Sequence, residues 1–265
     1  MKARSSIEFV IDAFDCKVSV RSDSEATLEC LNQFLLPALP RSAVSREPAE
    51  IAISVLSEKE KLAIFVDGVQ VSFANTLQDA ALGAVKALDE AIVRKLKRLR
   101  PVHAGAVVLH RKALLVPGSS RAGKSSLVAE LLSRGAAHLS DEYALVDQDG
   151  RVHAYPRPLL LRNGSPKQTL VLPAELKASY ASEAAPVGTI VAVEYAPEGS
   201  WKIERISHGE AVMLLLRNTP HEMGEAPEMI DFFTRCVAGA DCYAGTRGDV
   251  VEAADRILEL VGDSK

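Results

Sequence analysis

Residues 116–143 read VPGSSRAGKSSLVAELLSRGAAHLSDEY, and this stretch decides which fold the sequence predicts. Within it, residues 118–125 (GSSRAGKS) satisfy the pattern G-x-x-x-x-G-K-[ST]. Glycines permit backbone angles and close approaches that a β-carbon would block, and a turned backbone can point several N–H groups inward. The apolar run KALLVP before the pattern predicts a buried strand, and SLVAELLSRG after it predicts a helix that ends at Gly135.

The pattern predicts a loop that holds the phosphates of a nucleotide together with Mg²⁺. The positive end of the following helix adds to the attraction for an anion. Lys124 can reach the β- and γ-phosphates, and the Ser125 hydroxyl can bind Mg²⁺. The alternative, a Gly-Ser turn that only joins a strand to a helix, is disfavoured by the flanking runs. The candidate nucleotide-binding residues are Gly118, Ser119, Ser120, Arg121, Ala122, Gly123, Lys124, Ser125 and Ser126.

Acidic residues that could organise the metal follow at two places, Asp141-Glu142 after AAHLS and Asp147 after YALV. Asp147 lies in DQDG between two strand-like runs, which is typical of a hairpin turn. For Asp141-Glu142, one acid can organise Mg²⁺ and the other can take a proton from an attacking hydroxyl. Because adjacent residues of a strand face opposite ways, we expect this pair at a strand end where the chain bends. A plain surface pair remains an alternative.

Composition excludes several classes of function. The chain has 265 residues, a net charge of −4 and 5% aromatic residues, which argues against a nucleic-acid partner. Its longest apolar run, AVMLLL, is far shorter than a membrane span. No signal peptide is visible, so a cytoplasmic protein is expected. Four scattered cysteines without a CxxC pair predict reduced thiols rather than a disulfide framework or a zinc site.

The organisation of the chain predicts an N-terminal α+β segment over residues 1–100 and a second domain over residues 101–265. In the first, residues 7–20 alternate like a strand, Asp67-Gly68 predicts a hairpin, and residues 76–100 predict a helix. The basic end of that helix, RKLKRLR, is interpreted as cations at a helix C-terminus, with a patch for an anionic partner as the alternative. Five other arginines are interpreted as surface cations. The alternative is that they bind the phosphate or the molecule that accepts it. They are Arg121, Arg157, Arg162, Arg235 and Arg247.

The stretch resembles HPr kinase/phosphorylase and its relatives, within the P-loop kinases related to phosphoenolpyruvate carboxykinase. That family has a strand histidine before the loop, the loop G-x-S-G-x-G-K-S, a helix ending R-G, and a strand ending in a D-D pair. Here His103 precedes Lys124 by 21 residues, Arg134-Gly135 closes the helix, and Asp141-Glu142 stands where D-D is expected. More loosely, YPRPLLLR and the C-terminal end resemble kinase-like relatives in bacterial biosynthetic clusters, including those for modified peptides.

The resemblance implies a mixed-sheet α/β P-loop kinase core preceded by a smaller N-terminal α+β segment. It implies that Glu142 takes the place of the general base, that Asp141 lies beside it near the metal with Ser125, and that Lys124 neutralises the transferred phosphoryl. His103 would approach the phosphates or the base; without the resemblance, a strand histidine bonded to a backbone carbonyl is favoured. Two departures are that Glu142 is longer than Asp and that the E-x-R-G-x-G signature is not found after it. HPr as substrate and phosphorylase activity are therefore not expected.

The leading interpretation is an ATP- and Mg²⁺-dependent kinase that phosphorylates a hydroxyl, such as a Ser of a peptide or protein. A kinase of the same fold for a sugar or metabolite is the second interpretation. A nucleotide-binding regulatory ATPase is the third. The sequence leaves open the acceptor, the nucleotide preference and the oligomeric state, including a homo-oligomer.

Overall fold

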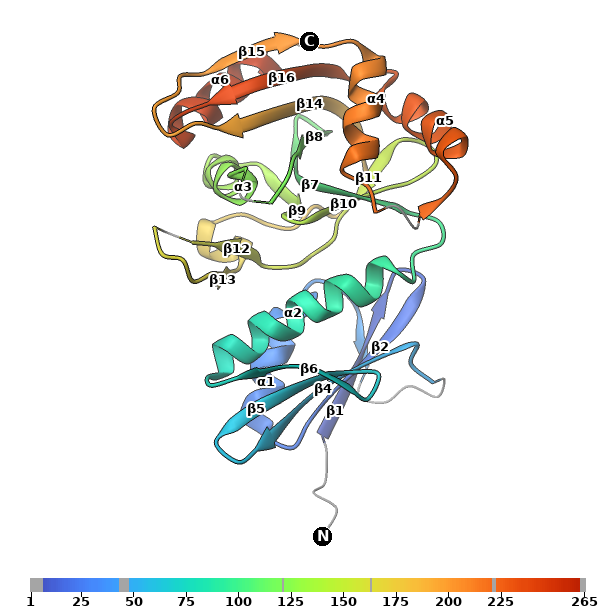
Figure 1. Ribbon diagram of the computed structural model, residues 1–265, viewed down its shortest axis with the longest axis vertical. Coiled ribbons are helices and arrows are strands. Elements are labelled where there is room, and N and C mark those ends of the chain that lie inside the picture. The colour runs from blue at the N-terminus through green and yellow to red at the C-terminus, as the bar shows by residue number, and fades with distance from the viewer. Residues whose placement is uncertain (1–6, 43–47, 121, 163, 221–222, 263–265) are drawn as a thin grey trace. The chain divides into compact units, whose positions relative to one another are not determined.

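The computed structural model describes residues 7–42, 48–120, 122–162, 164–220 and 223–262. The chain forms two compact units (Figure 1). Unit 1 holds the described residues up to Lys97, together with Pro156–Pro158 and those of Arg162–Leu170. Unit 2 holds the described residues of Arg98–Tyr155, Leu159–Leu161 and Val171–Lys265.

Unit 1 is a sheet with two helices. The strand order is β3-β1-β2-β4-β5-β6, and the pairing of β2 with β4 is parallel whereas the others are antiparallel. Both helices begin at a capping hydroxyl, Ser24 for α1 and Thr76 for α2. The elements are β1 (Ile7–Ala13), β2 (Cys16–Ser22), α1 (Glu25–Phe34), β3 (Arg41–Ser42), β4 (Ile51–Glu58), β5 (Lys61–Val66), β6 (Val69–Ala74) and α2 (Leu77–Val93).

Two predictions for unit 1 are wrong in their boundaries. Residues 7–20 form two paired strands, because the chain reverses at Phe14, whose φ of 57° lies in the left-handed region. Helix α2 ends at Val93 rather than near residue 100, because the N–H groups of Lys95 and Leu96 both bond to Ile92 O and close a turn there. The predicted hairpin at Asp67-Gly68 is confirmed, with positive φ at both residues and β5 paired to β6.

Unit 2 is built on a mixed sheet of order β11-β10-β7-β8-β14-β16-β15, with β9 also paired to β7. The strands β8, β14 and β16 run parallel, so their carboxyl ends lie at one edge of the sheet. Strand β11 also pairs with the start of β14, which partly closes the sheet on itself. The prediction of a mixed-sheet α/β fold is confirmed.

The remaining elements follow one another from residue 100 onward. In chain order they are β7 (Arg100–Leu109), β8 (Lys112–Pro117), α3 (Lys124–Ser133), β9 (Ala137–Ser140), β10 (Tyr143–Val146), β11 (Arg151–His153), β12 (Leu159–Leu161), β13 (Thr169–Val171), the 3₁₀ helix η1 (Pro173–Leu176), β14 (Ala185–Tyr195), β15 (Lys202–Arg205), α4 (His208–Arg217), α5 (Ala226–Val237), β16 (Asp241–Arg247) and α6 (Val250–Gly262).

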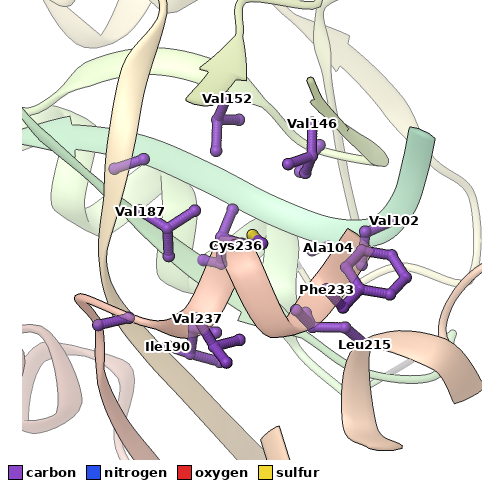
Figure 2. Packing of buried hydrophobic residues seen from close by; sticks show 14 of the residues in the cluster. Val102, Ala104, Val146, Val152, Val187, Ile190, Leu215, Phe233, Cys236 and Val237 are labelled. Atoms are coloured by element: carbon purple, nitrogen blue, oxygen red, sulfur yellow. The ribbon is translucent and has the colours of Figure 1, made fainter. Parts of the chain in front are cut away.

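The core of unit 2 has two parts. Side chains of α4 and α5 pack on one set of strands, where Phe233 and Val237 of α5 face Val102 of β7 and Ile190 of β14 (Figure 2). Helices α3 and α6 contribute to the second cluster, together with residues of β7, β8 and β14. Cys236 belongs to the first cluster, and burial raises the pKa of its thiol to about 12, as expected for an unreactive core cysteine. All four cysteines are free thiols.

Candidate active site

The glycine-rich loop (residues 118–125) begins where β8 ends and lies beside β7. Strands β7 and β8 pair so that Ala104 is opposite Pro117, and the N–H of Gly118 donates to His103 O at 3.4 Å. Gly105 of β7 has no room for a side chain, because a β-carbon there would lie 2.5 Å from Cγ2 of Val128 in α3. The missing side chain lets α3 pack closely on β7, which places the first residue of the helix next to His103.

The loop enters α3 through Gly123, the residue that caps the helix. Its φ of 81° and ψ of 19° lie in the left-handed region, which glycine adopts without strain. A glycine supplies no side chain to cap the helix, and the first turn of α3 carries no acidic residue. The N-terminal N–H groups and the positive end of the helix dipole therefore suit an anion.

Lys124, the first residue of α3, folds back over this loop. Its side chain is buried, and Nζ donates to Gly118 O and to Ser119 O, both at 2.9 Å. Burial lowers the pKa of the Lys124 ammonium, while the carboxylates of Glu142 and Asp141 raise it. A cation is thus held inside the loop and balanced by two acids from another part of the chain.

The acid pair Asp141-Glu142 lies between β9 and β10, at the bend that was predicted. Ser140 pairs with Ala106 and Tyr143 pairs with His103 in the same register, so the two acids lie opposite Gly105 and Ala104 of β7. The Ser140 hydroxyl shapes the bend by accepting from the N–H groups of Glu142 at 3.3 Å and Tyr143 at 3.1 Å. The N–H of Ala104 donates to Glu142 O at 3.1 Å, which ties the bend to β7.

Three side chains from separate elements meet beside the loop. The His103 Nε2 atom lies 3.3 Å from Lys124 Nζ and 3.2 Å from Glu142 Oε1. Because one imidazole nitrogen either accepts or donates a hydrogen bond, Nε2 can accept from Lys124 or donate to Glu142, but not both at once. The Glu142 side chain is 35% exposed, so a hydroxyl compound in solution can approach its carboxylate.

Asp141 is placed differently from its neighbour Glu142. It is 1% exposed, and its Oδ2 accepts from the N–H of Leu160, the middle residue of β12, at 2.9 Å. This bond joins the bend to another segment of unit 2, so Asp141 has a structural contact in addition to its charge near Lys124.

Asp147, the other acidic candidate, lies in the hairpin turn between β10 and β11. Its Oδ1 accepts from the N–H groups of Asp149 at 3.0 Å and Arg151 at 2.9 Å, and its Oδ2 lies 2.6 Å from His153 Nε2. Burial raises the pKa of Asp147, but these hydrogen bonds outweigh it and the net shift is downward. The interpretation of Asp147 as a turn residue is confirmed.

The other predicted nucleotide-binding residues belong to the loop and to the first turn of α3. Ser119, Ser120 and Ser126 are exposed, and Ala122 and Ser125 are half-buried. Arg121 lies outside the described residues. In the part of the chain that the structure describes, no group of three or more His, Cys, Asp or Glu side chains is arranged to hold a metal ion.

Two arginines were wrongly interpreted as surface cations. Arg157 is 1% exposed, and its Nη2 lies 2.8 Å from Asp89 Oδ2 within unit 1. Arg247, at the end of β16, is 3% exposed and donates from Nη2 to Gly123 O at 2.9 Å. Charge alone gives no signal for such burial, because it depends on which segments of the chain the fold brings together. Arg162 and Arg235 are exposed, as predicted.

Sequence reasoning also missed Ser140 and Tyr195. A serine directly before two acids is a weak signal for a hydroxyl-stabilised turn. Tyr195 ends β14, and its ring lies 5.1 Å below the Arg247 guanidinium.

Comparisons with known proteins show a distant likeness at the level of structure only. No protein-family model and no curated protein matches the sequence. Among solved structures, the Hpr(Ser) kinase/phosphatase from Coxiella burnetii matches with a TM-score of 0.36 and 13% identity, covering 62% of this chain and 99% of that chain. A relationship this distant assigns neither a substrate nor a reaction. Within the described residues, no helix has the length and apolarity needed to cross a membrane.

Proposed function

We propose that this protein is an ATP- and Mg²⁺-dependent kinase that transfers the γ-phosphate to a hydroxyl, with a Ser of a peptide or protein as the leading acceptor. The observation that carries the proposal is the meeting of Glu142 Oε1, His103 Nε2 and Lys124 Nζ beside the glycine-rich loop, at 3.2 Å and 3.3 Å. A loop that only joined a strand to a helix would need neither the buried lysine nor the carboxylate facing it.

The residues of the loop fit the phosphates of a nucleotide. Gly123 leaves the start of α3 without a side-chain cap, and no acid in the first turn repels an anion. Lys124 brings a cation whose present acceptors are the carbonyl oxygens of Gly118 and Ser119. Because a charged phosphate oxygen is a stronger acceptor than a neutral carbonyl, Lys124 would exchange these contacts for the β- and γ-phosphates.

Ser125 and Asp141 are the residues that would hold Mg²⁺. Ser125 follows Lys124 on the first turn of α3, and the Asp141 charge acts on Lys124. Phosphate oxygens and waters commonly complete the shell of a nucleotide-bound Mg²⁺. When bound, the ion would neutralise charge on the phosphates.

The chain's own residues would carry the transfer by positioning and charge. The Glu142 carboxylate accepts the proton of the acceptor hydroxyl as the hydroxyl oxygen bonds to the γ-phosphorus and the bond to ADP breaks. Lys124 neutralises charge that develops on the transferred phosphoryl. His103 lies between the two and holds the carboxylate side chain in place through Nε2.

The test is transfer of label from γ-labelled ATP by the purified protein, with Lys124→Ala as the inactive control. Separate reactions contain Ser peptides, small hydroxyl compounds such as sugars, and no acceptor. Label on a peptide supports the leading proposal, and label on a small compound moves the acceptor to the second class. Release of free phosphate without a labelled product supports a regulatory ATPase. Absence of any turnover or ATP binding in all reactions would contradict a nucleotide-dependent function.

A further inference from the structure

Arg247 connects the C-terminal end of β16 to the glycine-rich loop. It is the last residue of β16, and its side chain is almost fully buried. Its Nη2 donates to Gly123 O at 2.9 Å, its Nη1 donates to Gly248 O at 3.0 Å, and its guanidinium lies 5.1 Å from the centre of the Tyr195 ring. Two carbonyl oxygens and one aromatic face thus fix the orientation of the guanidinium.

The contact acts on the peptide unit between Gly123 and Lys124. The Gly123 carbonyl receives Arg247 Nη2 and also the N–H of Leu127 at 3.2 Å, which is the first hydrogen bond of α3. In a trans peptide the carbonyl oxygen and the amide hydrogen point in opposite directions. Fixing Gly123 O on the helix side therefore directs the Lys124 N–H toward the inside of the loop, where a phosphate would lie.

The arginine also occupies the space beside Gly123. A β-carbon at Gly123 would lie 2.0 Å from Arg247 Nη2 and 3.6 Å from Tyr195 Cβ. The positive φ of residue 123 favours glycine, and any β-carbon there would also displace the guanidinium from its present position. Gly123 of the loop thus packs against Arg247 at the end of β16 and Tyr195 at the end of β14.

We propose that Arg247 is a positioning residue that orients the Gly123–Lys124 peptide of the loop for binding the β-phosphate of a nucleotide, with Tyr195 supporting its guanidinium. This inference rests on the proposed nucleotide-binding function. Lysine cannot replace the arginine, because one ammonium on a flexible stem lacks the planar fork that reaches two carbonyl oxygens in fixed directions.

The experiment compares the unmodified protein with Arg247→Lys in two measurements. In hydrogen–deuterium exchange without nucleotide, we expect peptides covering residues 118–127 to exchange faster in the variant, with the melting midpoint little changed. In calorimetric titrations, we expect the affinities for ATP and ADP to fall together by about tenfold, because both carry the β-phosphate. A purely structural role would change the melting midpoint and leave nucleotide affinity unaffected in the folded protein.

The matched control is Arg205→Lys, because Arg205 lies on the adjacent strand β15, is 70% exposed, and pairs with Asp241. It should leave both measurements unchanged. If Arg247→Lys does not fold, Tyr195→Leu keeps the arginine but removes the supporting ring, and it should give a smaller change in the same direction. The inference is overturned if exchange and affinity are unchanged in the Arg247 variant, or if exchange rises without loss of affinity. If the unmodified protein binds neither ATP nor ADP, the proposed function itself fails.

Discussion

Two acidic turns follow one another in unit 2, and they use their carboxylates in opposite ways. In the turn after β10, Asp147 accepts from the N–H groups of Asp149 and Arg151 and contacts His153, so its oxygens serve the turn itself. In the bend after β9, the Ser140 hydroxyl accepts from the backbone N–H groups of Glu142 and Tyr143 instead. The side chain of Glu142 is then directed at His103 on another strand.

The difference shows what separates a structural acid from a candidate catalytic one. A carboxylate surrounded by the N–H groups of its own turn is occupied, and its negative charge is stabilised there. When a neutral hydroxyl satisfies those N–H groups instead, the adjacent carboxylate can act on a cation elsewhere in the unit, as Glu142 acts on Lys124. The bend with Glu142 should therefore govern activity, and the turn with Asp147 should govern stability.

The largest effect is expected from removing Lys124, the cation that the Glu142 bend faces and the Asp147 turn does not. Lys124→Ala removes the ammonium that would bind and neutralise the phosphoryl group. We expect the rate of label transfer to fall by roughly 1000-fold, corresponding to about 4 kcal/mol of lost transition-state stabilisation. Lys202→Ala, at an exposed lysine of β15, is the control and should keep the original rate. Transfer by Lys124→Ala at the rate of the control would contradict a central role of the loop in the reaction.

A direct comparison of the two turns comes from replacing each carboxylate by the matching amide. Glu142→Gln keeps the size of the side chain but cannot take a proton from a hydroxyl. We expect transfer to fall about 100-fold, while ATP affinity and the melting midpoint stay close to those of the unmodified protein. Rapid-quench measurement of product formation, with ATP titration in parallel, separates the two effects. Unchanged transfer in this variant would mean that Glu142 is not the base.

Some of this arrangement could be predicted from sequence, because its signals are local. The Gly118 to Ser125 pattern lies between an apolar strand and an amphipathic helix, and β8 and α3 form there as expected. The bend at Asp141-Glu142 also follows from local reasoning, since two adjacent acids cannot share one face of a strand. That His103 and Glu142 would lie together was implied by the resemblance rather than by the residues.

Other features depend on which strands become neighbours, and local patterns do not contain that information. Arg247 lies beside Gly123 because β14 pairs with both β8 and β16 in parallel, which brings the ends of these strands together. A lone arginine before Gly-Asp gives no sign of this. The end of α2 was misplaced for a different reason, because helical spacing continues in the sequence past the residue where the backbone turns.

On the Asp147 side of the comparison, a smaller effect is expected, and on stability alone. Asp147→Asn weakens the acceptor for two backbone N–H groups and the contact with His153. We expect a loss of about 1 kcal/mol and a melting midpoint lower by about 2–4 °C, with label transfer unchanged. Asp149→Asn is a closely matched control, because Asp149 is an exposed acid in the same turn and loses the same charge. A loss of transfer in Asp147→Asn would show that the two turns are not separated in function.

The stability difference between the unmodified protein and Asp147→Asn should itself depend on pH. Hydrogen bonds hold the pKa of Asp147 below its ordinary value of 3.8, so the folded protein keeps this carboxylate ionised where the unfolded chain binds a proton. Its contribution is therefore complete above about pH 5 and is lost as the pH falls below the ordinary pKa toward the folded one. Urea unfolding of both proteins at a series of pH values from neutral to acidic should show the difference shrinking at the acidic end. A difference that stayed constant to the acidic end of the series would mean that neutral contacts, rather than the ionised carboxylate, stabilise the turn.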